Sequence, residues 1–216
     1  ANANAARTPT SFKTVVLTGA SSGIGFAALT TLLSDPTTEY TVICAMKKQS
    51  ISPTKQKIAS IQSPLPPIGS ALFYECDLSS LSSIRRFASQ IRNVSIDVLA
   101  LNAGIARGLS SKSPAFTPEG FESTVGINHI GHTLLSTLLL PQVNKDTGRI
   151  VVTASSVHDP NTGGGKQGSP ASLGDLGGLR DAAAKVSTDP AKFEMVDGNT
   201  FNPDKAYKDS KLCNVF

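Results

Sequence analysis

Short apolar runs alternate with amphipathic stretches along most of this chain. The first run is residues 15–17 (Val-Val-Leu), and similar runs occur at 40–46, 71–78, 96–104 and 148–156. Short runs that are rich in β-branched residues and bounded by glycine or polar residues are typical of strands buried on both faces. The five runs therefore predict five strands of one parallel sheet.

The stretches between these runs have the spacing of helices. After the third run, apolar residues recur at intervals of three and four from Leu81 to Ile91. A longer helix is predicted to begin at Pro118, with Thr117 as its N-cap, and to end at Pro141. Because strands and helices alternate, the sequence predicts an α/β fold, a Rossmann-type doubly wound parallel sheet with helices on both faces.

Three glycines follow the first predicted strand in the pattern G-x-x-x-G-x-G. Glycines at such a position permit a tight turn and let the backbone approach a pyrophosphate at a helix N-terminus. A plain strand-to-helix turn, which is the alternative, needs one glycine rather than three. The segment therefore predicts a dinucleotide-binding loop with these candidate contacts: Gly19, Ser21, Ser22, Gly23, Ile24 and Gly25.

The end of the second predicted strand bears on the choice of nicotinamide cofactor. An NAD site usually places Asp or Glu there to bind the ribose 2′-hydroxyl, whereas a 2′-phosphate needs a cation. Lys47 and Lys48 occupy this place, with no acid beside them. NADPH is therefore the expected cofactor, and a simple solvated turn is the alternative explanation of the two lysines.

Tyr207 and Lys211 lie four residues apart near the end of the sequence, in the segment AYKDSK. If this segment is helical, both side chains lie on one face. An ammonium group beside a phenol favours the phenolate, which makes a tyrosine a usable proton donor or acceptor near neutral pH. The same spacing also occurs by chance in ordinary amphipathic helices, so the pair gains meaning only from its context.

Taken in order, these motifs resemble the short-chain dehydrogenase/reductase superfamily. The matching elements are TGASSGIG, Asp77 after the third strand, LNAG after the fourth, Asn128 in GINHIGH, and a serine pair before YKDSK. The resemblance implies further cofactor contacts at Asp77, Leu78, Asn102, Ala103, Gly104, Tyr207 and Lys211. It implies a catalytic group of Tyr207, Lys211, Asn128 and Ser155, with Ser156 as the rival for the hydroxyl position.

One departure from the superfamily pattern narrows the resemblance. Ser155 and Tyr207 are 52 positions apart, because an insertion of about residues 157–203 separates them. The insertion contains a DLG segment and a Met-Val-Asp-Gly step before KAYKDSKLCN. This arrangement is similar to the light-dependent protochlorophyllide oxidoreductase family. Retinol-dehydrogenase-like members share something close to NHIGH but lack the long insertion.

The resemblance implies a light-dependent reduction of protochlorophyllide to chlorophyllide with NADPH, a step of chlorophyll biosynthesis. Hydride would pass from the nicotinamide to a pigment double bond, and Tyr207 would supply the proton. Lys211 would bind the nicotinamide ribose, and Asn128 would position a water. The alternative is a light-independent short-chain dehydrogenase/reductase acting on retinoid-like or other carbonyl or alcohol substrates, and a third is a binding protein without turnover.

Composition excludes several other classes. Three cysteines without a C-x-x-C pair make a disulfide framework or zinc site unexpected. His129 and His132 are three residues apart, but they lack a third ligand at suitable spacing, so no metal is expected. The net charge of +4 is spread along the chain, so nucleic acid is not an expected partner. No run approaches the roughly 18 apolar residues of a membrane span.

Both ends of the sequence carry expectations of their own. Residues 1–10 are expected to be a disordered tail or the remnant of a transit peptide, since they are rich in alanine and contain no acid. The Rossmann domain is expected to cover 11–216 and to lack its C-terminal part. Without a further strand beside it, the fifth strand is an exposed apolar edge, which soluble proteins avoid. The family implies a plastid, with the cytoplasm of a photosynthetic bacterium as the alternative, and peripheral membrane contact and self-association are further family expectations.

Overall fold

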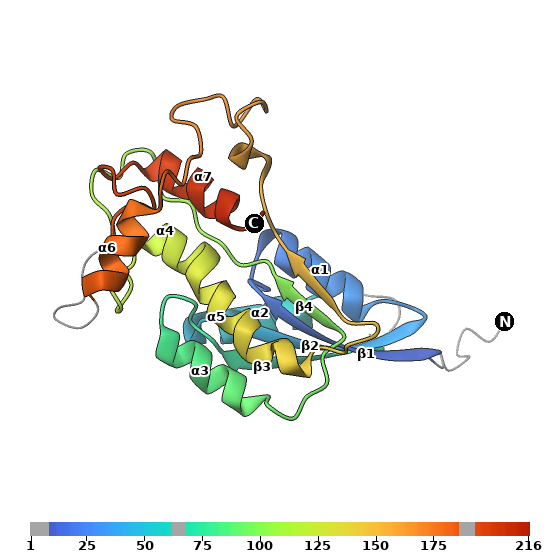
Figure 1. Cartoon of the computed structure of the whole chain (residues 1–216). Helices are drawn as coiled ribbons and strands as arrows, with labels where there is room; N and C mark the ends of the chain where they lie inside the picture. The colour runs from blue at the N-terminus through green and yellow to red at the C-terminus, as the bar shows by residue number, and fades with distance from the viewer. Residues whose placement is uncertain (1–8, 62–67, 186–192) are drawn as a thin grey trace. The chain divides into compact units, whose positions relative to one another are not determined.

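The computed structural model describes residues 9–61, 68–185 and 193–216 (Figure 1). Most of the predicted tail and a part of the insertion therefore lie outside the described residues. The chain divides into two compact units. The first comprises Ala1–Asp77, Arg85–Ala103 and Leu138–Val152, and the second comprises Leu78–Ile84, Gly104–Thr137 and Thr153–Phe216.

The first unit contains a sheet of five parallel strands in the order β3-β2-β1-β4-β5. In register, Val15 of β1 pairs with Val42 of β2 and with Val98 of β4. The α/β fold with a doubly wound parallel sheet is thereby confirmed. The strands are β1 (Ser11–Thr18), β2 (Thr38–Met46), β3 (Ser70–Glu75), β4 (Val98–Leu101) and β5 (Arg149–Val152).

Three predicted strands were too long at their carboxyl ends. The third was predicted to reach residue 78, the fourth 104 and the fifth 156, but they end at Glu75, Leu101 and Val152. At the end of β4 the reason is visible, because the next two backbone amides donate to the hydroxyl of Thr18 rather than to a neighbouring strand. An apolar run marks where a strand lies, but its hydrogen-bond partners decide where the strand stops.

The core of the first unit is built on the central strand. Val15, Val16 and Leu17 are at most 2% exposed, as predicted for a strand that is buried on both faces. Leu29 and Leu33 of α1 (Gly23–Leu33) pack against the face that carries Val15 and Leu17. In contrast, β5 lies at the edge of the sheet, and its residues 150–152 are between 42% and 52% exposed. The predicted exposed apolar edge is therefore present.

The remaining helices follow the predicted alternation, with one irregularity. The helix predicted to end at Pro141 consists of three segments and stops at Leu139, where a 3-10 turn follows. Its middle segment is a π-helix, η1, which contains Asn128. The helices are α2 (Lys48–Ala59), α3 (Leu81–Gln90), α4 (Ser123–Val125), η1 (Gly126–Ile130), α5 (Gly131–Leu139), η2 (Leu140–Gln142), η3 (Ser156–His158), α6 (Gly177–Lys185) and α7 (Pro203–Cys213).

The predicted start of the long helix at Pro118, with Thr117 as its N-cap, was wrong. Thr117 and Phe121 close a turn through a backbone bond of 2.8 Å, and Gly120 within it has a φ of +87° that a helix does not allow. The helix begins at α4, where the buried carboxylate of Glu122 accepts hydrogen bonds from the second and third amides of the helix. This acid supplies the cap that the sequence suggested for Thr117.

The insertion contributes to a second apolar core, within the second unit. Phe193 and Val196 of the insertion are buried together with Val125 of α4 and Ala182 of α6. The ring of Phe193 lies edge-on to that of Phe121, with centroids 6.4 Å apart. The described part of the insertion is therefore packed by its own apolar residues against the helix that leads to Asn128.

Candidate cofactor loop and catalytic helix

The glycine-rich loop connects β1 to α1 by a turn in which side chains would not fit. Gly19 has a φ of +74°, and a Cβ placed on it would lie 2.8 Å from the Cα of Ala103. A Cβ on Gly25 would lie 2.2 Å from the carbonyl oxygen of Gly19. These two glycines therefore permit the close contact of the helix start with the strand end, as the tight turn predicted from the sequence requires.

Thr18, which the sequence analysis did not single out, fixes the geometry of this loop. Its side chain is fully buried, and its hydroxyl oxygen accepts hydrogen bonds from the backbone amides of Asn102 (2.9 Å) and Ala103 (3.0 Å). The Asn102 side chain donates in return to the carbonyl of Thr18 at 3.1 Å. The predicted cofactor contacts at the ends of β1 and β4 are thus brought together. The available signal was the position of Thr18 directly before Gly19.

The polar residues of the loop leave its surface accessible. Ser22 is the N-cap residue of α1, but its side chain makes no capping hydrogen bond, and Ile24 is 73% exposed. The carbonyl of Ser21 accepts a hydrogen bond of 3.0 Å from Lys57 of α2. The backbone amides at this helix start are accessible, because the loop is exposed and its glycines have no side chains. Such a helix start is suited to bind the pyrophosphate of a dinucleotide.

Lys47 and Asp77 meet at the adjacent ends of β2 and β3. The Lys47 ammonium lies 3.9 Å from the Asp77 carboxylate, and both side chains are more than a third exposed. An exposed pair at this distance contributes little to stability, so Lys47 can exchange Asp77 for another anion at small cost. Lys48, the next residue, is exposed. Leu78, which was also predicted to contact the cofactor, is buried and belongs to the second unit.

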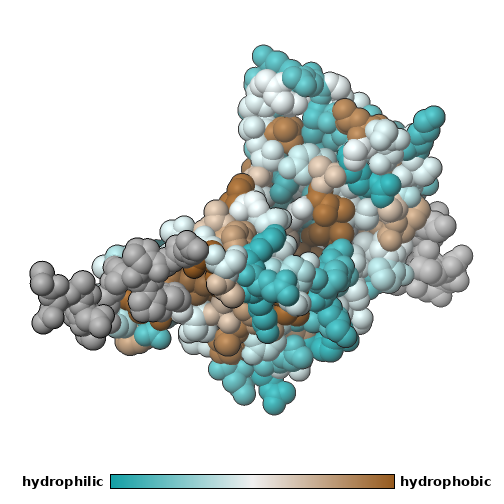
Figure 2. Space-filling model, turned by 180° about the vertical axis from the view of Figure 1, so that it is seen from behind, coloured by the Kyte–Doolittle hydropathy of each residue, from teal (hydrophilic) through white to brown (hydrophobic). Residues whose placement is uncertain are grey.

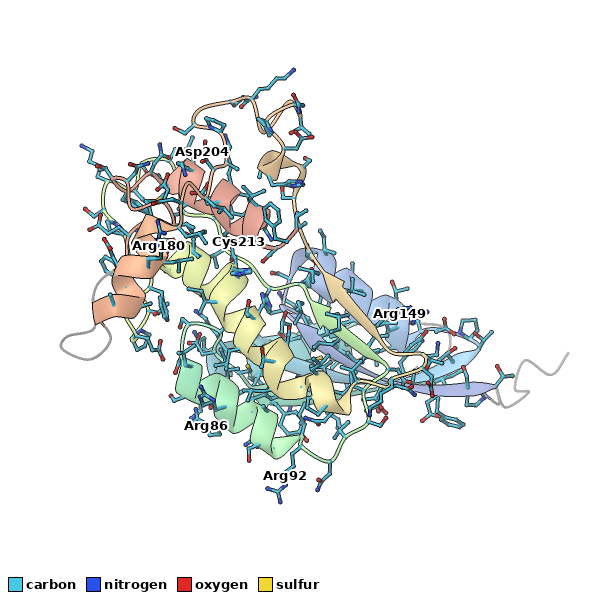
Figure 3. The ribbon with its side chains drawn as sticks, viewed as in Figure 1. Arg86, Arg92, Arg149, Arg180, Asp204 and Cys213 are labelled. Carbon is cyan, nitrogen blue, oxygen red and sulfur yellow. The ribbon has the colours of Figure 1, made fainter. Side chains whose placement is uncertain are left out.

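Helix α7 carries the Tyr207 and Lys211 pair on one face, as predicted. Its start is specified by the side chain of Asn202, which accepts from the amide of Lys205 at 3.0 Å, and by Pro203 in the first turn. In Figure 3 the labelled residues Asp204 and Cys213 mark the first turn and the last residue of this helix.

The ammonium of Lys211 is held beside the tyrosine ring in a buried position. It lies 5.8 Å from the centroid of the Tyr207 ring and donates to the carbonyl of Thr153 at 2.8 Å. Lys211 is 4% exposed, and burial lowers its pKa. The Thr153 carbonyl and the Tyr207 ring thus fix the position of this ammonium.

Asn128 lies in the π-helix and connects two other parts of the second unit. Its fully buried side chain accepts from the amide of Ile105 at 2.8 Å and donates to the carbonyl of Ile105 at 2.9 Å. It also donates to the hydroxyl of Ser210 on α7 at 3.0 Å. A Cβ on Gly104 would lie 3.3 Å from the Asn128 side-chain oxygen and 3.5 Å from the Lys211 nitrogen. Gly104, Asn128 and Lys211 therefore meet at one place.

Comparison with known proteins places this geometry in a family. The family model described as short chain dehydrogenase matches residues 13–165, which include the glycine-rich loop, Asn128 and both candidate serines. The chain belongs to the short-chain dehydrogenase family.

Relatives within the family match most of the chain. The chain is 38% identical over 206 residues to the chloroplastic protochlorophyllide reductase of Cucumis sativus, which covers 93% of this chain and 48% of that protein. It is 39% identical over 207 residues to the protochlorophyllide reductase of Avena sativa, and this match covers 93% of this chain and 62% of that protein. The chain thus spans about half the length of most of these relatives. The matched regions include nearly all of this short-chain dehydrogenase.

Solved structures agree with the family at the level of the fold. A putative uncharacterized protein from Mycobacterium paratuberculosis is 30% identical, with a TM-score of 0.62, and covers 94% of this chain and 59% of that one. An alcohol dehydrogenase from the archaeon Thermococcus sibiricus, solved with 5-hydroxy-NADP, is 23% identical, with a TM-score of 0.54 over 70% of this chain and 61% of that one.

The two candidate serines of this short-chain dehydrogenase differ in exposure. Ser155 is half-buried in extended backbone before η3, and Ser156 is exposed at its start. Among the described residues, neither serine is hydrogen-bonded to Tyr207, so Ser155 and Ser156 both stay candidates. A third serine was missed: Ser210 of α7 donates to the Tyr207 carbonyl at 2.7 Å and accepts from Asn128. Its position within YKDSK was the available signal.

His129 and His132 make hydrogen bonds within the second unit. His129 contacts the side-chain oxygen of Asn214 at 3.0 Å, and His132 contacts the backbone carbonyl of Asn128 at 3.0 Å. Burial lowers the pKa of His132 to about 4, so this imidazole is neutral near pH 7. In the parts of the chain that the structure describes, no three His, Cys, Asp or Glu side chains come together as metal ligands.

The surface carries both apolar and polar areas. Figure 2 shows hydrophobic side chains between hydrophilic ones on the face in view. None of the helices within the described ranges has the length and hydrophobicity that are needed to cross a membrane.

Proposed function

We propose that this protein is an NADPH-dependent oxidoreductase that reduces protochlorophyllide to chlorophyllide in light. The observation that carries the proposal is the buried Lys211 beside Tyr207, on a helix that follows a long insertion. Proteins named protochlorophyllide reductase are 38% and 39% identical to this chain and match 93% of it. Several such relatives are named as chloroplastic proteins, which supports a plastid location for this protein.

The proposed chemistry assigns a role to each group of candidate residues. The glycine-rich loop of the first unit would bind the pyrophosphate, and Asn102 with Ala103 would line the nicotinamide half. Bound NADPH supplies the hydride. Tyr207 would donate the proton to the neighbouring carbon, so that the two transfers together saturate one carbon–carbon double bond. Lys211 would stabilise the resulting phenolate and bind the ribose, and Asn128 would hold the water that returns the proton.

Light supplies the energy through the pigment in this proposal, and the protein supplies orientation and proton delivery. The test uses the natural full-length protein, mixed in the dark with NADPH and protochlorophyllide and then given one flash. We expect the red absorption band to move to that of chlorophyllide only after light and only with NADPH. Reduction in the dark, or turnover of retinal or simple carbonyls instead, would favour the light-independent alternative and overturn the proposal.

Lys47 is proposed to make the site selective for NADPH. Replacement of Lys47 by alanine is expected to weaken NADPH binding by about tenfold, because a charge-assisted contact to the 2′-phosphate is lost. NADH binding should stay nearly constant, since NADH has a hydroxyl in that place. Fluorescence titration of both nucleotides measures the two affinities. Lys48→Ala, with the same loss of charge at the next position, is the control, and an equal loss for NADH and NADPH would contradict the assignment.

A further inference from the structure

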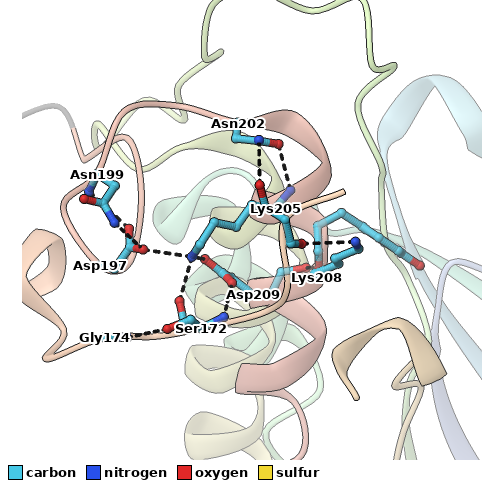
Figure 4. Close-up of polar contacts among 11 residues, drawn as sticks. Ser172, Gly174, Asp197, Asn199, Asn202, Lys205, Lys208 and Asp209 are labelled. Atoms are coloured by element: carbon cyan, nitrogen blue, oxygen red, sulfur yellow. Dashed lines mark hydrogen bonds and ion pairs between the residues drawn. The ribbon is translucent and has the colours of Figure 1, made fainter. Parts of the chain in front are cut away.

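Lys205 is the centre of a buried charge cluster between the insertion and helix α7 (Figure 4). Its ammonium lies 2.6 Å from the Asp209 carboxylate and 2.9 Å from that of Asp197, and it donates to the Ser172 carbonyl at 2.7 Å. The Asp209 side chain is completely buried, and those of Asp197 and Lys205 are 6% and 13% exposed. We call Lys205, Asp197 and Asp209 the back clamp.

The back clamp joins segments that are far apart in the sequence. Lys205 and Asp209 belong to α7, whereas Asp197 and Ser172 belong to the insertion, and the Ser172 amide also donates to Asp209 at 2.9 Å. Burial opposes the charge of Lys205, but the two carboxylates outweigh this cost and raise its pKa. Lys205 is therefore charged at neutral pH and is bonded to both carboxylates, although burial raises the pKa of Asp209.

A second lysine makes a parallel connection. Lys208 is 2% exposed, its ammonium pairs with Asp204 at 2.8 Å, and it donates to the carbonyls of Gln167 and Ser169, the latter at 3.1 Å. Lys205 and Lys208 are thus both bonded to backbone oxygens of the insertion. Two cations on successive turns of one helix hold the same inserted segment.

The position of these residues around α7 relates them to the catalytic pair. Successive residues of an α-helix are rotated by about 100° around its axis, so two residues that are two positions apart differ by about 200°. Asp209 is two residues from both Tyr207 and Lys211 and therefore lies on the opposite side of the helix. The Tyr207 and Lys211 face is held at Thr153, while the opposite face is held by the insertion through the back clamp.

We propose that the back clamp is a positioning device that fixes the rotation of α7 and thereby sets the face with Tyr207 and Lys211 against Thr153. This inference rests on the catalytic role assigned to that pair in the proposed function. Buried ion pairs give little net stability compared with apolar residues of similar size, whereas they specify geometry by their bond directions. The insertion therefore affects the reaction indirectly. Asp197 contacts the side of α7 that is opposite to Tyr207 and Lys211, and so helps to fix the position of these two residues.

The test separates positioning from stability by removing all charges of the clamp together. The triple variant Lys205→Met, Asp197→Asn, Asp209→Asn leaves no unpaired buried charge, so its melting temperature should stay close to that of the wild type. We expect its flash-driven turnover to fall by about tenfold to a hundredfold, since small misplacements of reacting groups have effects of this size. A fully active triple variant would overturn the proposal.

A second readout does not depend on the substrate. The labelling rate of Lys211 by an amine-reactive reagent, followed by mass spectrometry with the exposed Lys145 as internal reference, should rise severalfold in the triple variant. An unchanged rate would overturn the positioning role even if the proposed function holds. Conversely, a raised rate in a protein that lacks light-driven turnover would support the clamp and count against the proposed function.

Two single variants complete the experiment. Asp197→Asn removes the ion pair from the insertion but keeps its Ser172 contacts. It should reproduce part of both effects, which covers the case that the triple variant does not fold. Asp175→Asn is the matched control, because it breaks the exposed pair with Arg180 in the same insertion. Arg180 is labelled in Figure 3. Equal effects of Asp175→Asn and Asp197→Asn on turnover and on Lys211 labelling would contradict a specific role of the back clamp.

Discussion

Replacement of Tyr207 by phenylalanine is expected to lower turnover by about 10²- to 10⁴-fold, the usual contribution of a positioned proton donor. The ring that lies 5.8 Å from the Lys211 ammonium is retained, and only the hydroxyl is removed. NADPH binding should therefore stay nearly unchanged, because the glycine-rich loop and Lys211 are intact. Single-flash absorbance with saturating NADPH measures the turnover, and fluorescence titration measures the affinity.

The control for this substitution is Tyr74→Phe, which removes a hydroxyl from a ring that packs against Phe87 in the first unit. That variant should keep wild-type turnover. If Tyr207→Phe retains most of its activity, another group donates the proton, and Lys211 or a bound water becomes the next candidate. Loss of NADPH binding together with turnover would instead assign Tyr207 to the cofactor site alone.

Replacement of Gly25 by alanine is expected to have the second large effect, on both cofactor binding and folding. The added Cβ would lie 2.2 Å from the Gly19 carbonyl oxygen and 2.5 Å from the Asn102 side-chain nitrogen. The contact with the Gly19 carbonyl involves backbone and cannot be relieved without moving α1 away from the end of β1. We expect a loss of about 1–3 kcal/mol in the free energy of unfolding, as for other overpacked sites, and NADPH binding too weak to titrate.

The matched control is Gly163→Ala, since a Cβ at Gly163 would have no neighbour within 4 Å. Denaturant unfolding compares the stabilities, and nucleotide fluorescence compares the affinities. Wild-type NADPH affinity in Gly25→Ala would show that the close contact of helix and strand is dispensable, which would remove the physical basis for the three-glycine loop as the cofactor site.

Features with a local signal could be predicted from the sequence. The sheet was predictable because its strands are apolar on both faces, and the glycine-rich loop because only glycine fits there. Tyr207 and Lys211 were predictable as a pair because their spacing depends on one helix alone. All three are properties of contiguous residues, so no knowledge of distant contacts was required.

Features that depend on distant partners could not be predicted in this way. Lys205, Lys208 and Asp209 look like a solvated helix face in sequence, but their partners lie in the insertion. Thr117 before Pro118 has the chemistry of an N-cap, yet the backbone of Phe121 bonds to it in a turn and Glu122 caps the helix instead. The partners of the α7 residues are distant in sequence, whereas those of Thr117 are near but form a turn that helix-capping rules do not describe.

The π-helix at Gly126–Ile130 also changes how this chain can be aligned with its relatives. A π-turn holds one residue more than the α-helical turn it replaces, so it equals a single-residue insertion within a helix. The residues before Gly126 and those after Ile130 therefore do not follow one continuous helical period, because the second group is shifted by one residue relative to the first. An alignment that runs through this helix without a gap would place Asn128 or His132 opposite the wrong residue of any relative whose helix is regular, and each half should be matched separately.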